Sequence, residues 1–170
     1  MLRRLVLVAA VLAAAVPAAA LDLNLTAGLD LGGSFDLGAI SRDADVGYTL
    51  GLELVWDLPL VDVGVGAEYG FSRGASGDFN GSLSFAHVYA VGRLTVFGPV
   101  YLAARLGYSD LSVSDLVDGS ASGGPTWSVG GGFSFLGTLR AEALLNNVSG
   151  DIGDLDLDYQ TWSVRLVYTF

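Results

Sequence analysis

The sequence predicts an all-β protein, an eight-stranded antiparallel up-and-down transmembrane β-barrel, and three observations support this prediction. Runs of about ten residues alternate between apolar side chains and small or polar ones, which is the two-residue period of a strand with one apolar face. The connections between successive runs are alternately short and long, as in membrane barrels. Hydrophobic residues make up 52% of the chain, yet after the N-terminal region no segment stays apolar over the roughly 18 residues of a spanning helix.

The first 20 residues predict a secretory signal peptide. Arg3 and Arg4 form a short basic region, residues 5–16 are continuously apolar, and the three alanines at 18–20 fit the small-residue cleavage rule. A transmembrane anchor is the alternative, and it is disfavoured because the apolar run is shorter than the roughly 20 residues that a spanning helix needs. We therefore expect residues 1–20 to be removed on export and residues 21–170 to form one barrel domain.

The first three strands are predicted from strict alternation. In residues 21–32, leucines and one alanine occupy every second position, and residues 46–56 and 61–72 repeat the pattern. A short turn at residues 57–60 joins the second run to the third. The polar stretch at residues 33–45 predicts a longer loop between the first run and the second.

Residues 83–97 predict the fourth strand, although both of its registers are partly apolar. We favour the register that turns His87 and Arg93 inward, and a bulge within the strand would change it. The outward positions in that register are Ala86, Val88, Ala90, Gly92, Leu94 and Val96.

The remaining four strands complete an even number. Tight turns are predicted at Gly98-Pro99 and at Leu136-Gly137. The strands are expected at residues 100–109, 126–135 and 139–146 and at the C-terminal end of the chain. Polar stretches rich in Gly, Ser and Asp predict the other long loops, at residues 73–82, 110–125 and 147–156.

The placement of aromatic residues favours a membrane barrel over a soluble one. A soluble periplasmic ligand-binding barrel of the lipocalin type has the same number of strands, but its apolar face points inward. Here the aromatic residues collect toward the two ends of the predicted strands, as the two interfaces of a bilayer select. The predicted interface aromatics are Tyr48, Trp56, Tyr69, Phe71, Tyr108 and Trp127.

Charged residues on the inward face predict a filled lumen. An eight-stranded barrel has room inside for side chains and little else, and buried charges must be paired. We expect two acids and three arginines to share one level, with Asp62 and Arg140 below it and Glu68 above it. A general diffusion porin is therefore not expected, and a narrow, porin-like small-solute channel is the alternative. The predicted lumen network consists of Glu53, Glu142, Arg93, Arg105 and Arg165.

The end of the chain carries the most informative pattern. Alternate apolar residues lead to a terminal aromatic, and they are Trp162, Val164, Leu166, Tyr168 and Phe170. This pattern resembles the last strand of bacterial outer-membrane barrels, which the barrel-assembly machinery reads during insertion. Glycine-rich strands such as residues 89–93 and 100–108 extend the likeness. Residues 21–170 resemble the small OmpA/OmpX/opacity-protein-like barrels of the Gram-negative outer membrane.

The resemblance implies a monomeric integral outer-membrane protein, without enzymatic activity, that has a structural or surface-interaction role. The implied partners are outer-membrane lipid and lipopolysaccharide, with periplasmic chaperones and the barrel-assembly machinery during biogenesis. Some small outer-membrane barrels are lipid A-modifying enzymes that use a histidine near a serine. His87 is the only histidine, and Ser84 should face the opposite side of its strand, so catalysis is not expected.

The charge balance bears on partners and ions. Without Arg3 and Arg4 the chain has six basic and 18 acidic residues, a net charge of about −12, and it contains no lysine. A nucleic-acid partner is therefore not expected. No cofactor signature is found. Asp154, Asp156 and Asp158 would share one face of an extended chain, where carboxylate oxygens suit Ca²⁺. A solvated acidic loop is the alternative interpretation.

Overall fold

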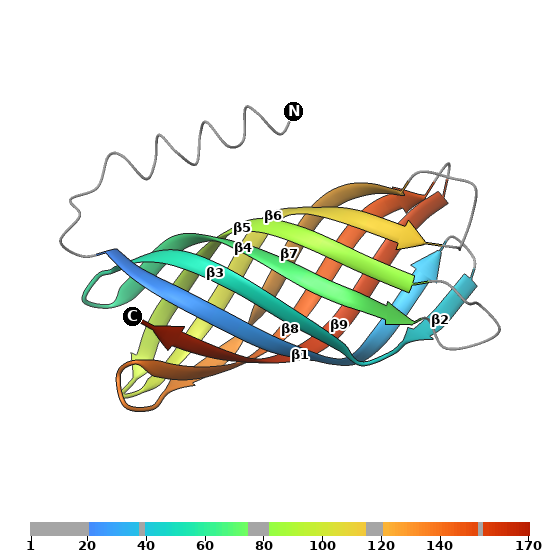
Figure 1. The fold of residues 1–170 in the computed structure, drawn as a ribbon. Helices are drawn as coiled ribbons and strands as arrows, with labels where there is room; N and C mark the ends of the chain where they lie inside the picture. The colour runs from blue at the N-terminus through green and yellow to red at the C-terminus, as the bar shows by residue number, and fades with distance from the viewer. Residues whose placement is uncertain (1–20, 38–39, 75–81, 115–120, 153–154) are drawn as a thin grey trace.

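The structure, a computed structural model, describes residues 21–37, 40–74, 82–114, 121–152 and 155–170, and their regular structure is entirely β (Figure 1). The predicted signal peptide lies outside these ranges. Within them, no helix has the length and apolar character needed to cross a membrane. The strands are β1 (Leu21–Leu37), β2 (Ile40–Ala44), β3 (Gly47–Asp57), β4 (Val61–Gly74), β5 (Ser82–Phe97), β6 (Val100–Ser114), β7 (Ala121–Ser134), β8 (Leu139–Ile152) and β9 (Leu155–Thr169).

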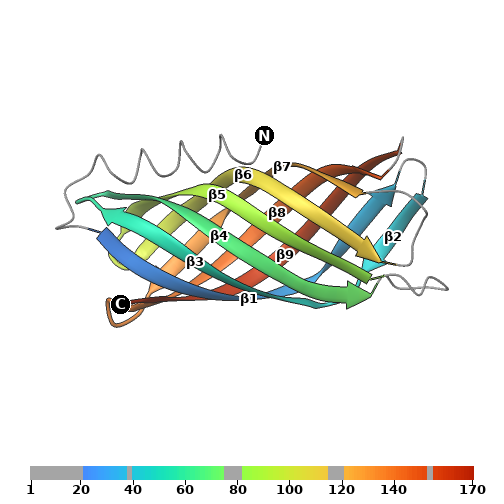
Figure 2. The ribbon, with the colours of Figure 1, turned by 45° about the horizontal axis from the view of Figure 1, so that its top comes forward.

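Eight of these strands close into a barrel. From β3 to β9 each strand pairs antiparallel with the next, β3 also pairs with β1, and β1 pairs with β9. Figures 1 and 2 show the tilted strands wrapping around one axis, with the start of β1 and the C-terminus at the same end. The predicted eight-stranded antiparallel up-and-down barrel is confirmed.

The short strand β2 continues the second barrel strand, β3. Both pair with β1 in one unbroken register, on either side of residues 45–46. At the same level β1 bulges, because its register against β9 shifts between Asp30 and Gly33. Gly32, inside this bulge, has a φ of 94°, which glycine adopts without the strain that a Cβ atom would cause.

The side chains point as the alternation predicts along most of the barrel. Leu50 and Leu52 of β3 are 47% and 52% exposed, whereas Glu53 is 1% exposed. In β5, His87 and Arg93 are buried and their neighbours along the strand, including Val88, face outward. The apolar face is therefore outside and the polar face inside, which is the inverse of a soluble ligand-binding barrel.

Most barrel strands are longer than the sequence predicted: β1 runs to Leu37 where residues 21–32 were expected, whereas β3 has the expected 11 residues. The expected loop at 110–125 was too wide, since β6 runs to Ser114 and β7 begins at Ala121. The expected loops at 33–45, 73–82 and 147–156 are likewise partly strand. All of this excess lies at the end opposite the tight turns, which we call the far end; the other end is the turn end.

The reason for this difference is that the side-chain pattern inverts at the far end. Strand pairing continues there, but the outward apolar residues that mark a strand in the sequence stop. We call these strand ends the far-end extension. Its buried inward residues are apolar, namely Phe85, Leu111, Val148, Leu157 and Tyr159. Its exposed outward residues are polar, namely Asp110, Ser112, Asp151, Asp158 and Gln160.

Glycines make two of the three tight connections at the turn end. Gly98, between β5 and β6, has a φ of 53°, and Gly137, between β7 and β8, has a φ of 78°. Both values lie in the left-handed region that favours glycine. These are the positions at which the sequence predicted short turns.

Candidate functional site

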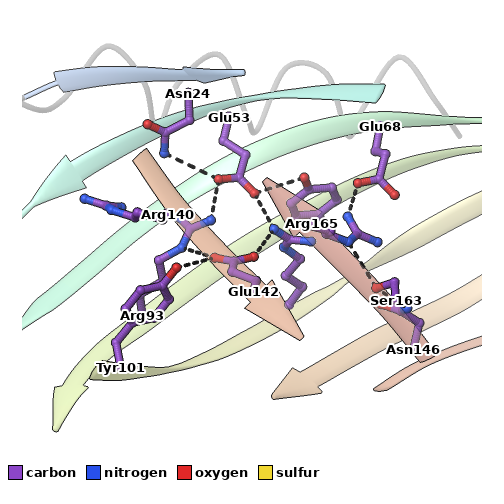
Figure 3. A network of polar contacts seen from close by, with 12 residues as sticks. Asn24, Glu53, Glu68, Arg93, Tyr101, Arg140, Glu142, Asn146, Ser163 and Arg165 are labelled. Atoms are coloured by element: carbon purple, nitrogen blue, oxygen red, sulfur yellow. Dashed lines mark hydrogen bonds and ion pairs between the residues drawn. The ribbon is translucent and has the colours of Figure 1, made fainter. Parts of the chain in front are cut away.

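The main candidate site is a charged cluster in the lumen, which we call the central network. It consists of Glu53 on β3, Arg93 on β5, Arg105 on β6 and Glu142 on β8. Figure 3 labels Glu53, Arg93 and Glu142 of this set. Arg93 Nη2 donates to Glu53 Oε2 at 2.7 Å, and Arg93 Nε donates to Glu142 Oε1 at 2.7 Å. Arg105 Nη2 donates to Glu53 Oε1 at 2.9 Å and to Glu142 Oε2 at 2.7 Å. Each carboxylate is thus bound by both arginines.

The central network is closed to solvent and electrically balanced. The exposed fraction of its four side chains is 3% or less. Taking an ion out of water costs several kcal/mol, and close partners with further hydrogen bonds offset that cost. The charges of two carboxylates and two guanidiniums cancel, so the complete network can be buried. Loss of any one member would leave an uncompensated buried charge.

Two tyrosines that the sequence analysis did not identify complete the central network. The Tyr89 hydroxyl donates to Glu53 Oε1 at 3.1 Å, and the Tyr101 hydroxyl donates to Glu142 Oε1 at 3.2 Å. Each ring lies across the neighbouring strand where that strand has a glycine. A Cβ atom on Gly66 would approach the Tyr89 ring to 2.7 Å, and one on Gly132 would collide with the Tyr101 ring. An inward tyrosine beside an inward glycine was the sequence signal available.

The structure brings four of the five predicted network residues together and places the fifth, Arg165, elsewhere. Arg165 Nη1 bonds to Glu68 Oε2, and Arg165 Nε donates to Ser163 Oγ at 3.3 Å. Asn146 Nδ2 also donates to Ser163 Oγ, at 2.9 Å. The physical reason is charge balance, since a third arginine would leave the central network with a surplus positive charge. Glu68, expected above the layer, supplies the matching acid.

A further ion pair, separate from the central network and the Arg165–Glu68 pair, lies at the turn end of the lumen. Arg140 Nη1 is 3.1 Å from Asp62 Oδ2, and these side chains are 12% and 16% exposed. They line a polar cavity of about 380 Å³ whose wall also includes Arg93 and Tyr101. This vestibule borders the central network, whose four side chains are almost fully buried.

The predicted outer-surface residues lie on the outer face of the barrel. Of the six interface aromatics, all but Trp56 are clearly exposed, and Trp56 is partly exposed. The rings of Tyr69 and Phe71 meet edge to face, with centroids 5.4 Å apart. The five alternating residues of the proposed insertion signal, from Trp162 to Phe170, also point outward, and the Phe170 N–H donates to the Leu23 carbonyl at 3.0 Å.

The only histidine has serine and glutamate neighbours that the sequence did not reveal. The strand register places Glu68, His87 and Ser109 side by side on the inner face. Ser109 is fully buried, and its hydroxyl has no hydrogen-bond partner among the described residues. The His87 ring instead lies against Phe85, with centroids 4.3 Å apart. Among the described residues, His87 and Ser109 therefore do not form a nucleophile–base pair.

The calcium hypothesis falls mostly outside the described side chains. Asp154 and the side chain of Asp156 are not described, while Asp158 is exposed and accepts a hydrogen bond from Ser149 Oγ at 3.0 Å. Among the described residues, no group of three or more His, Cys, Asp or Glu side chains is arranged to hold a metal ion. The calcium site stays a prediction.

Comparison with known proteins gives one family and several similar structures. Residues 5–170 match the family described as "Outer membrane protein beta-barrel domain". No curated protein matches the sequence. The neisserial surface protein A (NspA) is similar with a TM-score of 0.64 and 14% identity, over 87% of this chain and 97% of NspA. Ail, the attachment invasion locus protein of Yersinia pestis, is similar with a TM-score of 0.59 and 14% identity, over 88% of this chain and 98% of Ail. At this identity the likeness to both structures concerns the fold.

Proposed function

This chain belongs to the outer membrane protein β-barrel domain family, and from that premise we propose that it is a non-enzymatic integral outer-membrane protein with a structural or surface-interaction role. The family and the closed barrel both support an outer-membrane location. The observation that carries the proposal is the central network, which fills the lumen with mutually bonded side chains. The far-end extension is then the part of the protein available to partners.

Outer-membrane fractionation combined with surface proteolysis tests the location and the orientation. We propose that residues 1–20 are cleaved on export and that the far end faces the outside of the cell. Protease added to intact cells should cut between β4 and β5, between β6 and β7, or between β8 and β9. Cuts confined to the tight turns would show that the turn end, and not the far end, faces outside. Recovery in the soluble periplasm would contradict the proposal. The mass of the purified protein tests the cleavage.

The far-end surface favours a particular class of partner. The printed names of NspA and Ail describe a surface protein and an attachment protein, and a structure of Ail holds the heparin analogue sucrose octasulfate. Here Asp43, Asp110, Asp151 and Asp158 are exposed at the far end, and they would repel such a polyanion. We propose contact with outer-membrane lipid and with lipopolysaccharide bridged by divalent cations.

A heparin column separates this proposal from a sulfated-polysaccharide role. The refolded protein should pass through the column at low salt, with Ail as the retained control. Retention of this chain would contradict the charge argument. Removal of divalent cations by a chelator should weaken its association with lipopolysaccharide vesicles and leave its association with zwitterionic vesicles unchanged.

The two other functions considered are an enzyme and a channel, and each has a direct test. The lipid A of cells that express the protein should have an unchanged mass spectrum, and His87→Ala should change nothing; a new lipid A species that needs His87 would show an enzyme. The protein should also give no unitary conductance in a planar bilayer, because the central network closes the lumen. Discrete conductance steps would favour the narrow channel.

A further inference from the structure

A small cavity lies in the lumen on the far-end side of the central network. It measures about 20 Å³, counted as the space open to the centre of a water molecule. Its wall includes Glu68, Arg105, Ser128, Asn146 and Arg165. A cavity measured in this way holds one water when it exceeds roughly 10–15 Å³. The space is thus large enough for one water and too small for an organic ligand.

Several buried polar atoms of the cavity wall have no hydrogen-bond partner among the described residues. On the donor side these are Nε and Nη1 of Arg105, and on the acceptor side they are Oε1 of Glu68 and Oδ1 of Asn146. The exposed fractions of these three residues are 3%, 4% and 5%. Buried polar groups in folded proteins almost always have a partner, and ordered water supplies it where side chains do not.

The mixture of donors and acceptors decides which species fits. An anion would satisfy the Arg105 donors but would repel the Glu68 carboxylate, and a cation would satisfy Glu68 but would repel two arginines. Water donates and accepts at once. We propose that one ordered water occupies this cavity, accepts from Arg105, and donates to Glu68 and Asn146. The water joins the central network to the Glu68–Arg165 pair in one continuous network.

The surroundings predict that this water exchanges slowly. On the turn-end side lies the central network, whose side chains are almost fully buried. On the far-end side lie the buried polar residues His87 and Ser109 and, beyond them, buried apolar residues such as Phe85 and Tyr159. The described side chains on both sides are thus buried, and we expect slow exchange with bulk solvent. This inference rests on the fold alone and does not depend on the proposed function.

Cross-relaxation between water and the Arg105 Nε–H tests the proposal in the refolded protein in detergent micelles. Laboratory-frame and rotating-frame measurements together distinguish a bound water from hydrogen exchange. We expect contacts of opposite sign in the two experiments, which is the signature of a long-lived water. The absence of such a contact would overturn the proposal. In a crystal soaked in bromide, an anomalous peak in the cavity would overturn it in favour of an anion.

Substitution of Ser128 provides an independent test, because Ser128 is paired with both Arg105 and Asn146 across the sheet. Ser128→Val should fill the cavity, abolish the water contact at Arg105, and raise the unfolding equilibrium constant about tenfold or more through the unsatisfied donors. Ser128→Ala leaves room for the water and should retain the contact. The matched control is Ser109→Val, which makes the same change on the same face outside the cavity and should preserve the contact. A more stable Ser128→Val variant would show that the cavity is dry.

Discussion

The main part of the barrel and its far-end extension are built from the same strands with opposite polarity. In the main part most leucines and aromatics of the strands face outward, whereas the ion pairs and the inward Tyr89 and Tyr101 fill the interior. In the extension Leu111, Leu157 and Tyr159 face inward, and Asp110, Asp158 and Gln160 face outward. Each arrangement matches its surroundings, lipid around the first and water around the second. We therefore propose that the change of polarity along single strands marks where the membrane ends.

The largest expected effect comes from breaking the interior of the main part. Arg105→Glu should destabilise the barrel by about 3–5 kcal/mol, because Glu53 and Glu142 would lose one of their two arginines and gain a buried like charge. Urea unfolding in lipid vesicles measures the change. Arg140→Glu, at the partly exposed turn end, is the control and should cost less. Equal stability of Arg105→Glu and the parent would show that the central network is not balanced as described.

The matching test in the extension removes apolar bulk instead of charge. Leu157 is 1% exposed, so Leu157→Ala should cost about 2–4 kcal/mol through lost burial and the cavity that remains. Its outward neighbour Asp158 should tolerate Ala with a change of less than about 1 kcal/mol. Thermal unfolding of both variants in detergent measures the difference. If the aspartate variant were the less stable of the two, the inverted polarity of the extension would be wrong.

Filling the space beside an inward tyrosine should destabilise the barrel less than either of the two substitutions above. Gly132→Ala should destabilise the barrel by about 1–3 kcal/mol, because the new Cβ atom collides with the Tyr101 ring. Gly131 faces outward, and a Cβ atom added there would come no closer than 3.4 Å to its nearest neighbour, the Tyr101 carbonyl oxygen. Gly131→Ala is therefore the matched control and should be neutral. Unfolding midpoints of the two variants in urea make the comparison.

The smallest effect is expected at the turn-end mouth. Asp62→Asn breaks the ion pair with Arg140, but both side chains are partly exposed, so the cost should be about 0–1 kcal/mol. Added salt should shrink even that difference, because exposed pairs are screened. If Asp62→Asn lost as much stability as Arg105→Glu, the Asp62–Arg140 pair would be shielded from water more than its exposed fraction indicates.

The sequence was most predictive where one strong physical requirement acts. Lipid on one side forces alternation, so the outward face of β5, for example, could be assigned from Val88 and Leu94 although both registers looked apolar. The same rule failed in the extension because water replaces lipid there. Residues such as Ser112 and Asp151 then resemble a loop, even though the backbone ladder beneath them is unbroken.

The interior was predicted less completely, since alternation says which side chains enter the lumen but not which ones meet. Counting along the strands grouped Arg165 with Glu53 and Glu142, although its side chain pairs with Glu68. Three arginines and two glutamates leave one positive charge unbalanced. Requiring zero net charge in the buried network would have indicated that Glu68 belongs to it. Tyr101 also faces inward by parity, but its contact with Glu142 depends on the space left by Gly132, which lies on another strand.

The seam between β1 and β9 has a consequence for how the protein is made. The Thr169 hydroxyl donates to Asn24 Oδ1 at 2.7 Å, joining residues 145 positions apart, and the Asn24 amide reaches Glu53 of the central network at 3.5 Å. The chain loses conformational entropy on closing such a long loop before the distant contacts can stabilise it. A topology of this kind therefore folds slowly. The barrel cannot close until β9 pairs with β1. Until then a partly assembled sheet has two open edges, ready to pair with another chain.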